Sequence, residues 1–394
     1  MRFRHPDGST VHLAYCTNVH PAEDYDGVLA QLGDHAEPVR RRLGRDRLGI
    51  GLWLAADAVR TLGSDPAALR RLKRELDDRG LEVVTLNGFP YQGFGDQVVK
   101  YRVYKPDWTE QPRLDHTADL ARLLATLLPD DAAEGTISTL PLAWRTDFGD
   151  DQRKKALAAL HILASRLEAI EELTGRRIRV GLEPEPGCTV ETTSDAIEAL
   201  TGADAPPPDR IGICVDTCHL ATEFEDPDTA IPALTASGVA IVKTQLSAAL
   251  QAADPHDAAV RTALQAFAEP RFLHQTRTRA AQGVRGVSGT DDLDEALTGG
   301  LPTAGEWRSH FHVPLHAPLE PPLAATTGVL KSALTHLVGG PHPLTRHLEV
   351  ETYTWHALPP HLRPRSRAQL ADGIAAELSL ARDLLTELGL KELP

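Results

Sequence analysis

The stretch Leu182-Glu183-Pro184-Glu185-Pro186-Gly187 places two carboxylates directly behind a β-rich run at residues 177–181. Successive side chains of a strand point to opposite faces, so Glu183 and Glu185 share one face if the strand extends this far. A carboxylate at the end of a buried strand is unfavourable unless a cation or a hydrogen-bond donor meets it. The stretch therefore indicates a strand that ends in a binding site.

Two later strands end in the same way. The run at residues 211–215 leads into Asp216-Thr217-Cys218-His219, and the run at residues 347–353 carries Glu349 and Glu351 on one face. The strands of a parallel barrel place their carboxyl ends at one mouth, where barrel enzymes bind their ligands. Three apolar strands that end in acid predict such a barrel with a metal ion at its mouth.

The rest of the chain alternates between strand and helix patterns, which calls for a parallel sheet. We expect one α/β domain over residues 1–394, a (β/α)8 TIM barrel. Residues 248–322 break the rhythm and are expected to form a long insertion between strands 7 and 8, with β-like pieces at 271–276 and 308–315. Further strands are predicted at residues 11–20, 48–54, 81–86, 136–142 and 239–247, and helices at residues 23–43, 67–79, 114–128, 151–173, 326–337 and 366–388.

Composition narrows the class of protein. The 394 residues are 42% hydrophobic, which is enough for a sizeable core, and carry a formal net charge of −14, which argues against a nucleic-acid surface. No apolar run reaches the roughly 18 residues of a membrane span, and no leader pattern is recognised. Cys214 and Cys218 are interpreted as small buried thiols. We expect a cytoplasmic protein with neither membrane insertion nor a nucleic-acid partner.

The candidate metal ligands are Glu183, Asp216 and Glu351, one from each acidic strand end. Hard divalent cations such as Mg²⁺ and Mn²⁺ prefer carboxylate oxygens. A fourth, neutral ligand is expected from the seventh strand, where Gln245 is the polar residue nearest the carboxyl end that could still reach a central ion. The alternative is structural, because acids at strand ends also cap helices or pair with arginines.

A second pair of acids stays open as an alternative to Glu183 and Glu351. Glu185 lies one pleat higher than Glu183, between two prolines, where it would contact substrate. Glu349 lies one pleat deeper than Glu351 and would pair with a buried cation such as Lys243. The sequence does not decide between the two pairs.

Four more side chains are candidates for substrate binding. Asn87 and Trp144 close the third and fourth strands, where an amide and an aromatic face would shape a pocket, although an Asn-Gly pair is equally a turn signal. His219 follows Asp216 by three residues and would bind substrate or orient the acid, and His312 is a candidate for a further ligand or acid. Each histidine alone is more often structural.

The order of these motifs resembles the xylose isomerase-like TIM barrel superfamily, which includes sugar isomerases, ketose 3-epimerases and inosose-processing enzymes. Six stretches spread over most of the chain are more specifically similar to the EboE-type metabolite traffic proteins, a family named for an operon's export role. They are YCTNVHP at 15–21, TLNGFPY at 85–91, STLPL at 138–142, LEPEPG at 182–187, HFHVPL at 310–315 and EVETYTW at 349–355.

The resemblance implies roles for individual residues. The superfamily's two metal-bound glutamates fall on Glu183 and Glu351, its metal-bound aspartate on Asp216, and the histidine three residues later on His219. Its seventh-strand ligand is usually a histidine, where this chain has Gln245. The implied reaction is proton transfer beside a carbonyl, with the two glutamates on opposite faces of the reacting carbon.

Three function classes follow from these observations. The first is a metal-dependent isomerase or epimerase for a small polyhydroxylated metabolite, such as a sugar or cyclitol, with a divalent metal ion (Mn, Mg, Co or Zn) and a link to metabolite biosynthesis or export. The second is a metal-dependent hydrolase or lyase on the same barrel, and the third is a non-catalytic component of metabolite transport. A homo-oligomer is compatible with each class.

Overall fold

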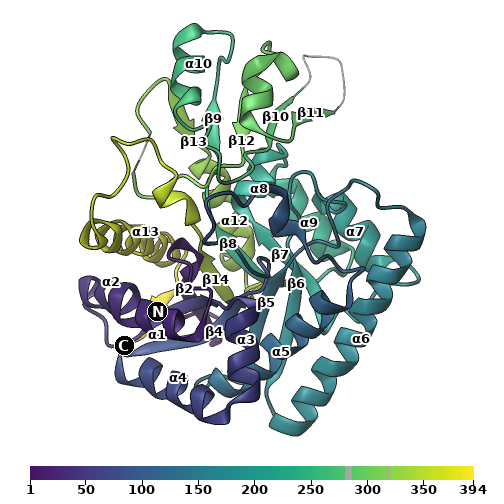
Figure 1. The fold of residues 1–394 in the computed structure, drawn as a ribbon, viewed down its shortest axis with the longest axis vertical. Coiled ribbons are helices and arrows are strands. Elements are labelled where there is room, and N and C mark those ends of the chain that lie inside the picture. The colour runs from purple at the N-terminus through teal and green to yellow at the C-terminus, as the bar shows by residue number, and fades with distance from the viewer. Residues whose placement is uncertain (280–285, 318) are drawn as a thin grey trace.

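Eight parallel strands close into a barrel in the described part of the chain, which in the computed structural model comprises residues 1–279, 286–317 and 319–394 (Figure 1). Each strand pairs with the next in parallel, and β14 pairs with β2 to complete the ring. The predicted (β/α)8 TIM barrel is therefore confirmed. Its strands are β2 (Thr10–Cys16), β3 (Leu48–Trp53), β4 (Leu81–Asn87), β5 (Glu134–Thr139), β6 (Arg177–Leu182), β7 (Ile211–Asp216), β8 (Ile241–Leu246) and β14 (His347–Val350).

Helices cover the outside of the barrel, as the alternating patterns predict (Figure 1). The longest, α6, ends at Gly175, whose φ of 68° suits a residue without a Cβ atom. The helix predicted at residues 23–43 is divided by a π-helical turn at Leu32–Ala36. The helices are α1 (Tyr25–Gln31), α2 (Glu37–Leu43), α3 (Ala56–Ser64), α4 (Pro66–Asp78), α5 (Gln111–Leu127), α6 (Asp150–Thr174), α7 (Thr193–Thr201), α8 (Thr217–Thr222), α9 (Pro227–Ala236), α12 (Thr327–Val338) and α13 (Arg367–Glu387).

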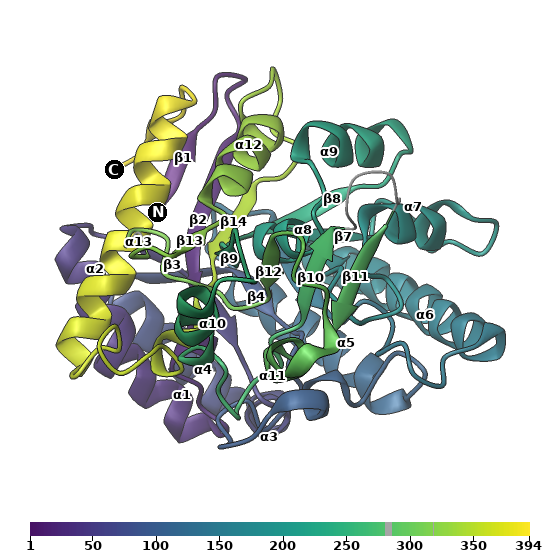
Figure 2. The same ribbon diagram turned by 90° about the horizontal axis from the view of Figure 1, so that it is seen from above.

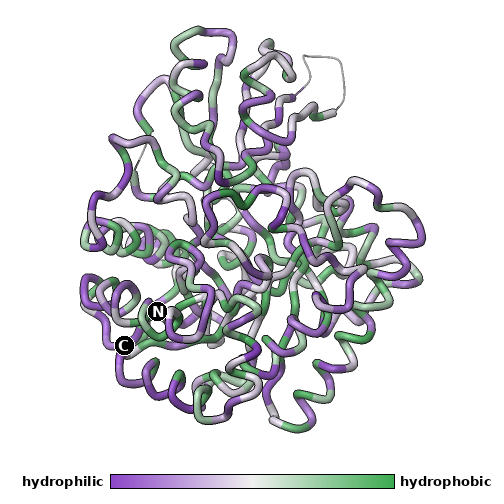
Figure 3. The backbone as a smooth tube through the Cα atoms, in the orientation of Figure 1, coloured by the Kyte–Doolittle hydropathy of each residue, from purple (hydrophilic) through white to green (hydrophobic). Residues whose placement is uncertain are grey.

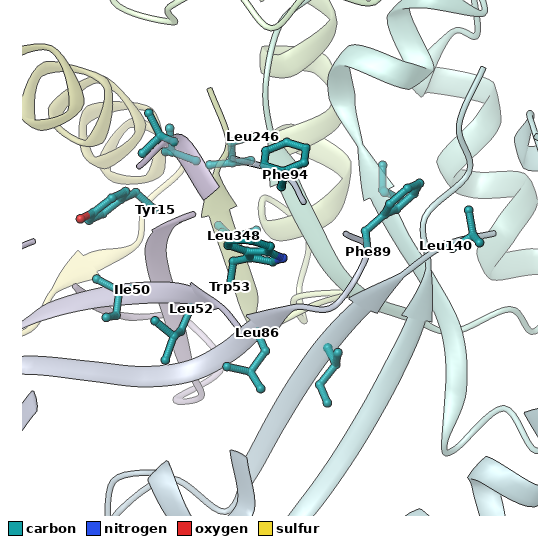
Figure 4. Packing of buried hydrophobic residues seen from close by; sticks show 14 of the residues in the cluster. Tyr15, Ile50, Leu52, Trp53, Leu86, Phe89, Phe94, Leu140, Leu246 and Leu348 are labelled. Atoms are coloured by element: carbon teal, nitrogen blue, oxygen red, sulfur yellow. The ribbon is translucent and has the colours of Figure 1, made fainter. Parts of the chain in front are cut away.

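The hydrophobic core fills the space between the strands and the outer helices. Strands β3, β4, β7, β8 and β14 are buried along their whole length, as expected for a parallel sheet covered on both faces. Side chains such as Leu52, Trp53 and Leu86 pack together at the barrel wall (Figure 4). Hydrophobic positions follow the central strands, and hydrophilic positions lie mainly on the outer surface (Figure 3). None of the helices among the described residues is long and apolar enough to span a membrane.

A second sheet lies over the carboxyl ends of the barrel strands (Figures 1 and 2). Among the described residues it contains five antiparallel strands in the order β11-β10-β12-β9-β13. Residues 280–285 and 318, which belong to the predicted insertion at 248–322, lie outside the described residues. The strands are β9 (Leu250–Ala252), β10 (Thr276–Arg279), β11 (Val287–Thr290), β12 (Trp307–Ser309) and β13 (Leu323–Ala325), accompanied by α10 (Ala258–Gln265) and α11 (Leu293–Glu295).

The two β-like pieces predicted in this segment differ from the observed strands. The strand predicted at residues 271–276 begins only at Thr276, and the one predicted at 308–315 ends at Ser309. The backbone N–H of His310 still donates to the Gln275 carbonyl at 2.8 Å, but that of Phe311 turns back to Ser309. Residues 310–315 therefore leave the sheet and run to the mouth of the barrel, which strand periodicity alone does not indicate.

Candidate metal centre at the barrel mouth

Three carboxylates meet at the mouth of the barrel. Glu183 follows β6, Asp216 ends β7 and Glu351 follows β14, and one carboxylate oxygen of each lies within 4.8 Å of the others. The three residues are 3%, 2% and 4% exposed. Parallel strands converge at their carboxyl ends, so acids far apart in sequence become neighbours here. We call Glu183, Asp216 and Glu351 the carboxylate cluster.

Asp216 also caps a helix, which is the structural role expected from the sequence as the alternative for acids at strand ends. Its Oδ1 accepts hydrogen bonds from the backbone N–H groups of Cys218 (2.7 Å) and His219 (2.9 Å) at the start of α8, and from the Ser247 hydroxyl (2.7 Å). Its Oδ2 is buried and has no hydrogen-bond partner among the described residues. Capping therefore occupies one oxygen of Asp216 and leaves the other for a cation.

Two amides fix the orientation of Glu351. The side-chain N–H groups of Asn18 and Asn87 donate to its Oε1 at 2.7 and 2.8 Å. In contrast, Glu183 Oε2 is buried without a partner among the described residues. The strand-end position of Asn87 predicts it at this site, whereas sequence reasoning missed Asn18, although it too follows a barrel strand, β2.

Electrostatics show that the carboxylate cluster needs a positive charge. Burial and the neighbouring carboxylates raise the pKa values of Glu183 and Glu351 well above the usual range of a glutamate. Among the described residues, no lysine or arginine forms an ion pair with these acids, and the buried cation Lys243 is paired instead with Glu349 at 3.2 Å. Carboxylates in such a setting bind a proton or a metal ion.

The floor below the cluster contains Lys243, Glu349 and Gln245. Lys243 Nζ also donates to the Leu86 carbonyl at 3.3 Å, and Glu349 fits against Gly51, where a Cβ atom would lie 1.4 Å from its carboxylate. Gln245 pairs in register with both Asp216 and Glu349, and neither atom of its buried amide has a partner among the described residues. Side chains two residues apart in a strand point to the same face. The Gln245 side chain therefore points into the barrel, as the Lys243 side chain does.

Three histidines adjoin the carboxylates. His219 Nε2 lies 3.0 Å from His310 Nε2, which lies 3.1 Å from His312 Nε2. A ligand atom of Asp216 lies within 4.8 Å of those of His219 and His312. Burial lowers the pKa of His312 to about 4 and that of His310 well below the usual range. We call His219, His310 and His312 the histidine cluster.

A pocket of about 50 Å³ opens above both clusters. Of the predicted substrate-binding residues, Asn87, Glu185, His219 and His312 line it, whereas Lys243 lies below in the floor. Trp144 does not line the pocket; its ring packs against Tyr104 with centroids 4.6 Å apart. The aromatic rings of Phe94, Phe272 and Tyr353 form one wall.

Glu185 is held by residues that sequence reasoning missed. The Tyr104 hydroxyl donates to Glu185 Oε1 at 2.6 Å, and the side-chain N–H of Gln275 donates to that hydroxyl at 2.8 Å. Tyr104 lies in the long loop between β4 and α5, and Gln275 precedes β10. Neither position has a periodic pattern that would have identified it. Glu185 thus lies beside the carboxylate cluster rather than within it.

Comparisons with known proteins agree with this architecture. The xylose isomerase-like TIM barrel family matches residues 48–261, more than half of the chain, and the protein belongs to this family. Among solved structures, a xylose isomerase-like TIM barrel protein from Mycobacterium smegmatis in complex with magnesium aligns with a TM-score of 0.52 and 12% identity over 95% of this chain and 98% of its own. No curated protein matches the chain in sequence.

Two further solved structures share the fold. A protein from Anabaena variabilis described as a sugar phosphate isomerase/epimerase aligns with a TM-score of 0.51 and 14% identity over 97% of this chain and 100% of its own. The IolI protein with a bound zinc atom aligns with a TM-score of 0.50 and 12% identity over 96% and 99%. At these identities the likeness extends to the barrel, not to the reaction.

Proposed function

We propose that the protein is a metal-dependent isomerase or epimerase that moves a proton next to a carbonyl in a small polyhydroxylated molecule, such as a sugar or cyclitol. The observation that carries the proposal is the carboxylate cluster: three buried acids within 4.8 Å, two of them with an oxygen lacking any partner among the described residues. A link to metabolite biosynthesis or export follows from the sequence resemblance alone.

The cluster and Gln245 fit a divalent cation. Glu183 Oε2, Asp216 Oδ2 and the Gln245 amide oxygen are buried oxygens without partners among the described residues, and oxygen donors suit Mg²⁺ and Mn²⁺. When bound, such an ion would hold a carbonyl and an adjacent hydroxyl and stabilise negative charge between them. The magnesium and zinc present in related structures are consistent with a metal at this mouth.

The two glutamates are suited to different parts of the proton transfer. No described residue donates to Glu183 Oε2, whereas two amides donate to Glu351 Oε1, so the two carboxylates are held differently. Glu351 is oriented by Asn18 and Asn87 and keeps its other oxygen for the reacting carbon. We assign removal of the proton to Glu183 and its return to Glu351. The aromatic wall of the pocket limits water around both groups.

Deuterium exchange tests the proposal. The metal-loaded protein is incubated in D₂O with a panel of ketoses and inososes, and NMR follows deuterium at the carbon beside the carbonyl. Glu183→Gln and Glu351→Gln should each slow exchange by about 10²- to 10⁴-fold, because an amide occupies the site but takes no proton. In Glu351→Gln the amide oxygen can still accept from Asn18 and Asn87, which preserves the geometry.

Glu82→Gln is the matched control for loss of a buried acid. Glu82 lies on β4 with its side chain 3% exposed, but it pairs with Arg2 at 2.8 Å, far from the mouth. This variant should exchange deuterium at the wild-type rate per folded molecule. Metal content is measured for every variant, so that loss of the ion is separated from loss of the base. No exchange by metal-loaded wild type over the whole panel would reject the proposed reaction.

A hydrolase or lyase is the second candidate, and the histidine cluster is the observation that favours it. Imidazoles beside a carboxylate are typical of sites that activate a bound water. The same panel, extended to phosphate esters and analysed for bond cleavage, separates the two reactions. Cleavage without exchange supports the second candidate. The absence of both cleavage and exchange supports the non-catalytic carrier.

A further inference from the structure

The histidine cluster has no task in the proposed proton transfer. We propose that His219, His310 and His312 form a separate zinc site beside the carboxylate cluster, with Asp216 shared between the two. This inference goes beyond the proposed reaction and does not depend on it, since it concerns which cations the mouth binds. It rests on the positions of three nitrogen atoms and on the hydrogen bonds behind them.

The spacing of the nitrogens suits one metal ion. The Nε2 atoms are 3.0 Å apart between His219 and His310 and 3.1 Å apart between His310 and His312. Two imidazole nitrogens on a tetrahedral zinc ion, each about 2.0–2.1 Å from the metal, lie roughly 3.3 Å apart. The three rings are 4%, 4% and 1% exposed, so they are held in a closed pocket rather than on a mobile surface.

Hydrogen bonds fix the tautomer of all three rings. His219 Nδ1 lies 2.8 Å from the Pro184 carbonyl, and His312 Nδ1 lies 2.7 Å from the Glu351 carbonyl. Because a carbonyl only accepts, each Nδ1 carries a proton and each Nε2 carries a lone pair. A ring that donates from one nitrogen to a carbonyl and presents the other to a metal is the usual arrangement of a histidine ligand.

His310 reaches the same tautomer through a side chain. Its Nδ1 lies 2.8 Å from Gln275 Oε1. The amide of Gln275 cannot be reversed, because its N–H group donates to the Pro186 carbonyl at 2.9 Å. His310 Nδ1 is therefore also the protonated nitrogen, so all three Nε2 atoms carry lone pairs, and those of His219 and His312 lie 3.0 and 3.1 Å from that of His310.

A proton cannot satisfy this arrangement. One proton on His310 Nε2 can be directed at His219 or at His312, and the Nε2 lone pair of the other histidine is then left without a donor. The Tyr353 hydroxyl, 3.3 Å from His310 Nε2, can donate to that one nitrogen only. A single divalent cation at the centre accepts all three lone pairs at once. Imidazole donors favour Zn²⁺ and Co²⁺ over Mg²⁺ and Mn²⁺.

Asp216 and Cys218 are the two candidates for a fourth ligand. Asp216 belongs both to the carboxylate cluster and to a group with His219 and His312 whose ligand atoms all lie within 4.8 Å. The Asp216 oxygen that lies 3.9 Å from His219 Nε2 is Oδ1, which also accepts the hydrogen bonds at the start of α8. Cys218, whose sulfur lies within 4.8 Å of ligand atoms of His310 and His312, is the competing fourth ligand. A shared Asp216 would make the mouth a two-metal centre with one oxygen-rich and one nitrogen-rich site.

The test uses cobalt and zinc with the tag-free, metal-stripped protein, saturated with Mg²⁺ to fill the carboxylate cluster. Wild type should bind Co²⁺ with the intense visible bands of tetrahedral coordination, and X-ray absorption of the zinc form should show about three imidazoles. A thiolate-to-cobalt band in the near ultraviolet would assign the fourth position to Cys218 instead of Asp216. Absence of tetrahedral bands in wild type would overturn the site without any variant.

Variants then separate the two clusters. His310→Ala and His312→Ala should weaken zinc binding by more than about 100-fold, since even partners of ligands change affinity by 10- to 100-fold. Glu183→Ala should keep the cobalt bands, and so should His116→Ala, which removes a buried histidine on α5. Unchanged zinc affinity in both histidine variants, with folding verified by circular dichroism, rejects the site. Loss of deuterium exchange alone would reject only the proposed reaction.

Discussion

The carboxylate cluster and the histidine cluster face the same pocket but are built by different parts of the chain. Glu183 and Glu351 follow barrel strands, so the closed sheet holds them. His310 and His312 follow β12 of the second sheet, and only His219 belongs to the barrel. The barrel therefore supplies the carboxylate oxygens and one histidine nitrogen, and the segment laid over it supplies the other two histidines. A segment laid over a barrel can in this way change the chemistry of a mouth whose strands stay the same.

The largest effect should come from Asp216, which belongs to both clusters. Asp216→Ala should lower the affinity for Mn²⁺ and for Zn²⁺ by more than about 100-fold each. Glu183→Ala should affect only Mn²⁺, and His312→Ala only Zn²⁺. Calorimetric titration of each ion into metal-stripped protein measures the effect. Unchanged Mn²⁺ binding in both Asp216→Ala and Glu183→Ala would reject the carboxylate site.

The residues that form the floor below the carboxylate cluster should contribute to stability. Lys243→Met leaves Glu349 as an unpaired buried charge and should lower the free energy of unfolding by about 3–5 kcal/mol. Adding Glu349→Gln removes that charge and should restore most of the loss, because the pair contributes little over neutral groups. Denaturant unfolding of the single and double variants gives the comparison. A double variant as unstable as Lys243→Met would contradict this account.

Glu377 connects helix α13 both to the segment after β14 and to the segment that carries His310 and His312, and it should make stability depend on pH. Its carboxylate accepts from Leu315 N at 3.0 Å, Thr352 Oγ1 at 2.6 Å and Trp355 Nε1 at 3.1 Å. Burial raises its pKa from 4.5 to about 7. Between these two pH values Glu377 keeps its proton in the folded protein, whereas the unfolded chain has released it. The contribution of Glu377 to the free energy of unfolding is therefore complete below pH 4.5 and is lost as the pH rises through 7.

Glu377→Gln should remove this dependence, which amounts to about 3 kcal/mol over the window. Unfolding by denaturant at several pH values from 4.5 to 8 measures the slope for wild type and variant. Exposed Glu168→Gln on α6 serves as the control and should leave the slope unchanged. An equal slope in wild type and Glu377→Gln would show that other groups govern the pH dependence.

The smallest effects should distinguish the carboxylate cluster from the histidine cluster most clearly. Asn18→Ala removes a donor to Glu351, and Gln275→Leu removes the acceptor behind His310. Each should weaken one metal by about 10- to 100-fold, Mn²⁺ for Asn18→Ala and Zn²⁺ for Gln275→Leu. The other metal should bind as in wild type. If both variants weaken both metals equally, the clusters act as one site.

The sequence predicts the barrel and its acids for a clear physical reason. Strand and helix periodicities are local, and the carboxyl ends of parallel strands must meet at one mouth. These two rules predict that acids from the three strand ends lie together, but they leave open whether Glu183 and Glu351 or Glu185 and Glu349 join Asp216. Asn18 escapes the prediction because the strand predicted at residues 11–20 runs past it, whereas β2 ends at Cys16 and Asn18 lies in the short 3₁₀ helix Thr17–Val19 that follows.

Sequence reasoning identifies His219 and His312 as candidates, but it does not predict that they form a cluster with His310. The pattern at residues 308–315 predicts a strand, yet β12 ends at Ser309, and the segment that follows crosses to the mouth. Where it crosses depends on how the second sheet lies over the barrel, and no local periodicity encodes that. In the sequence, His310 is therefore one of several single histidines. The role of Gln275 depends on the same non-local placement.

Closure of the barrel between β14 and β2 also bears on how the chain folds. The hydrogen bond from Asn18 to Glu351 joins residues that are 333 positions apart in the sequence. Contacts of such sequence separation form late, because the entropy of the intervening chain opposes them until the strands between are in place. The mouth therefore exists only in the finished ring. A metal taken up there acts as a reporter of completed folding, and partially folded chains should be recognisable by their failure to bind it.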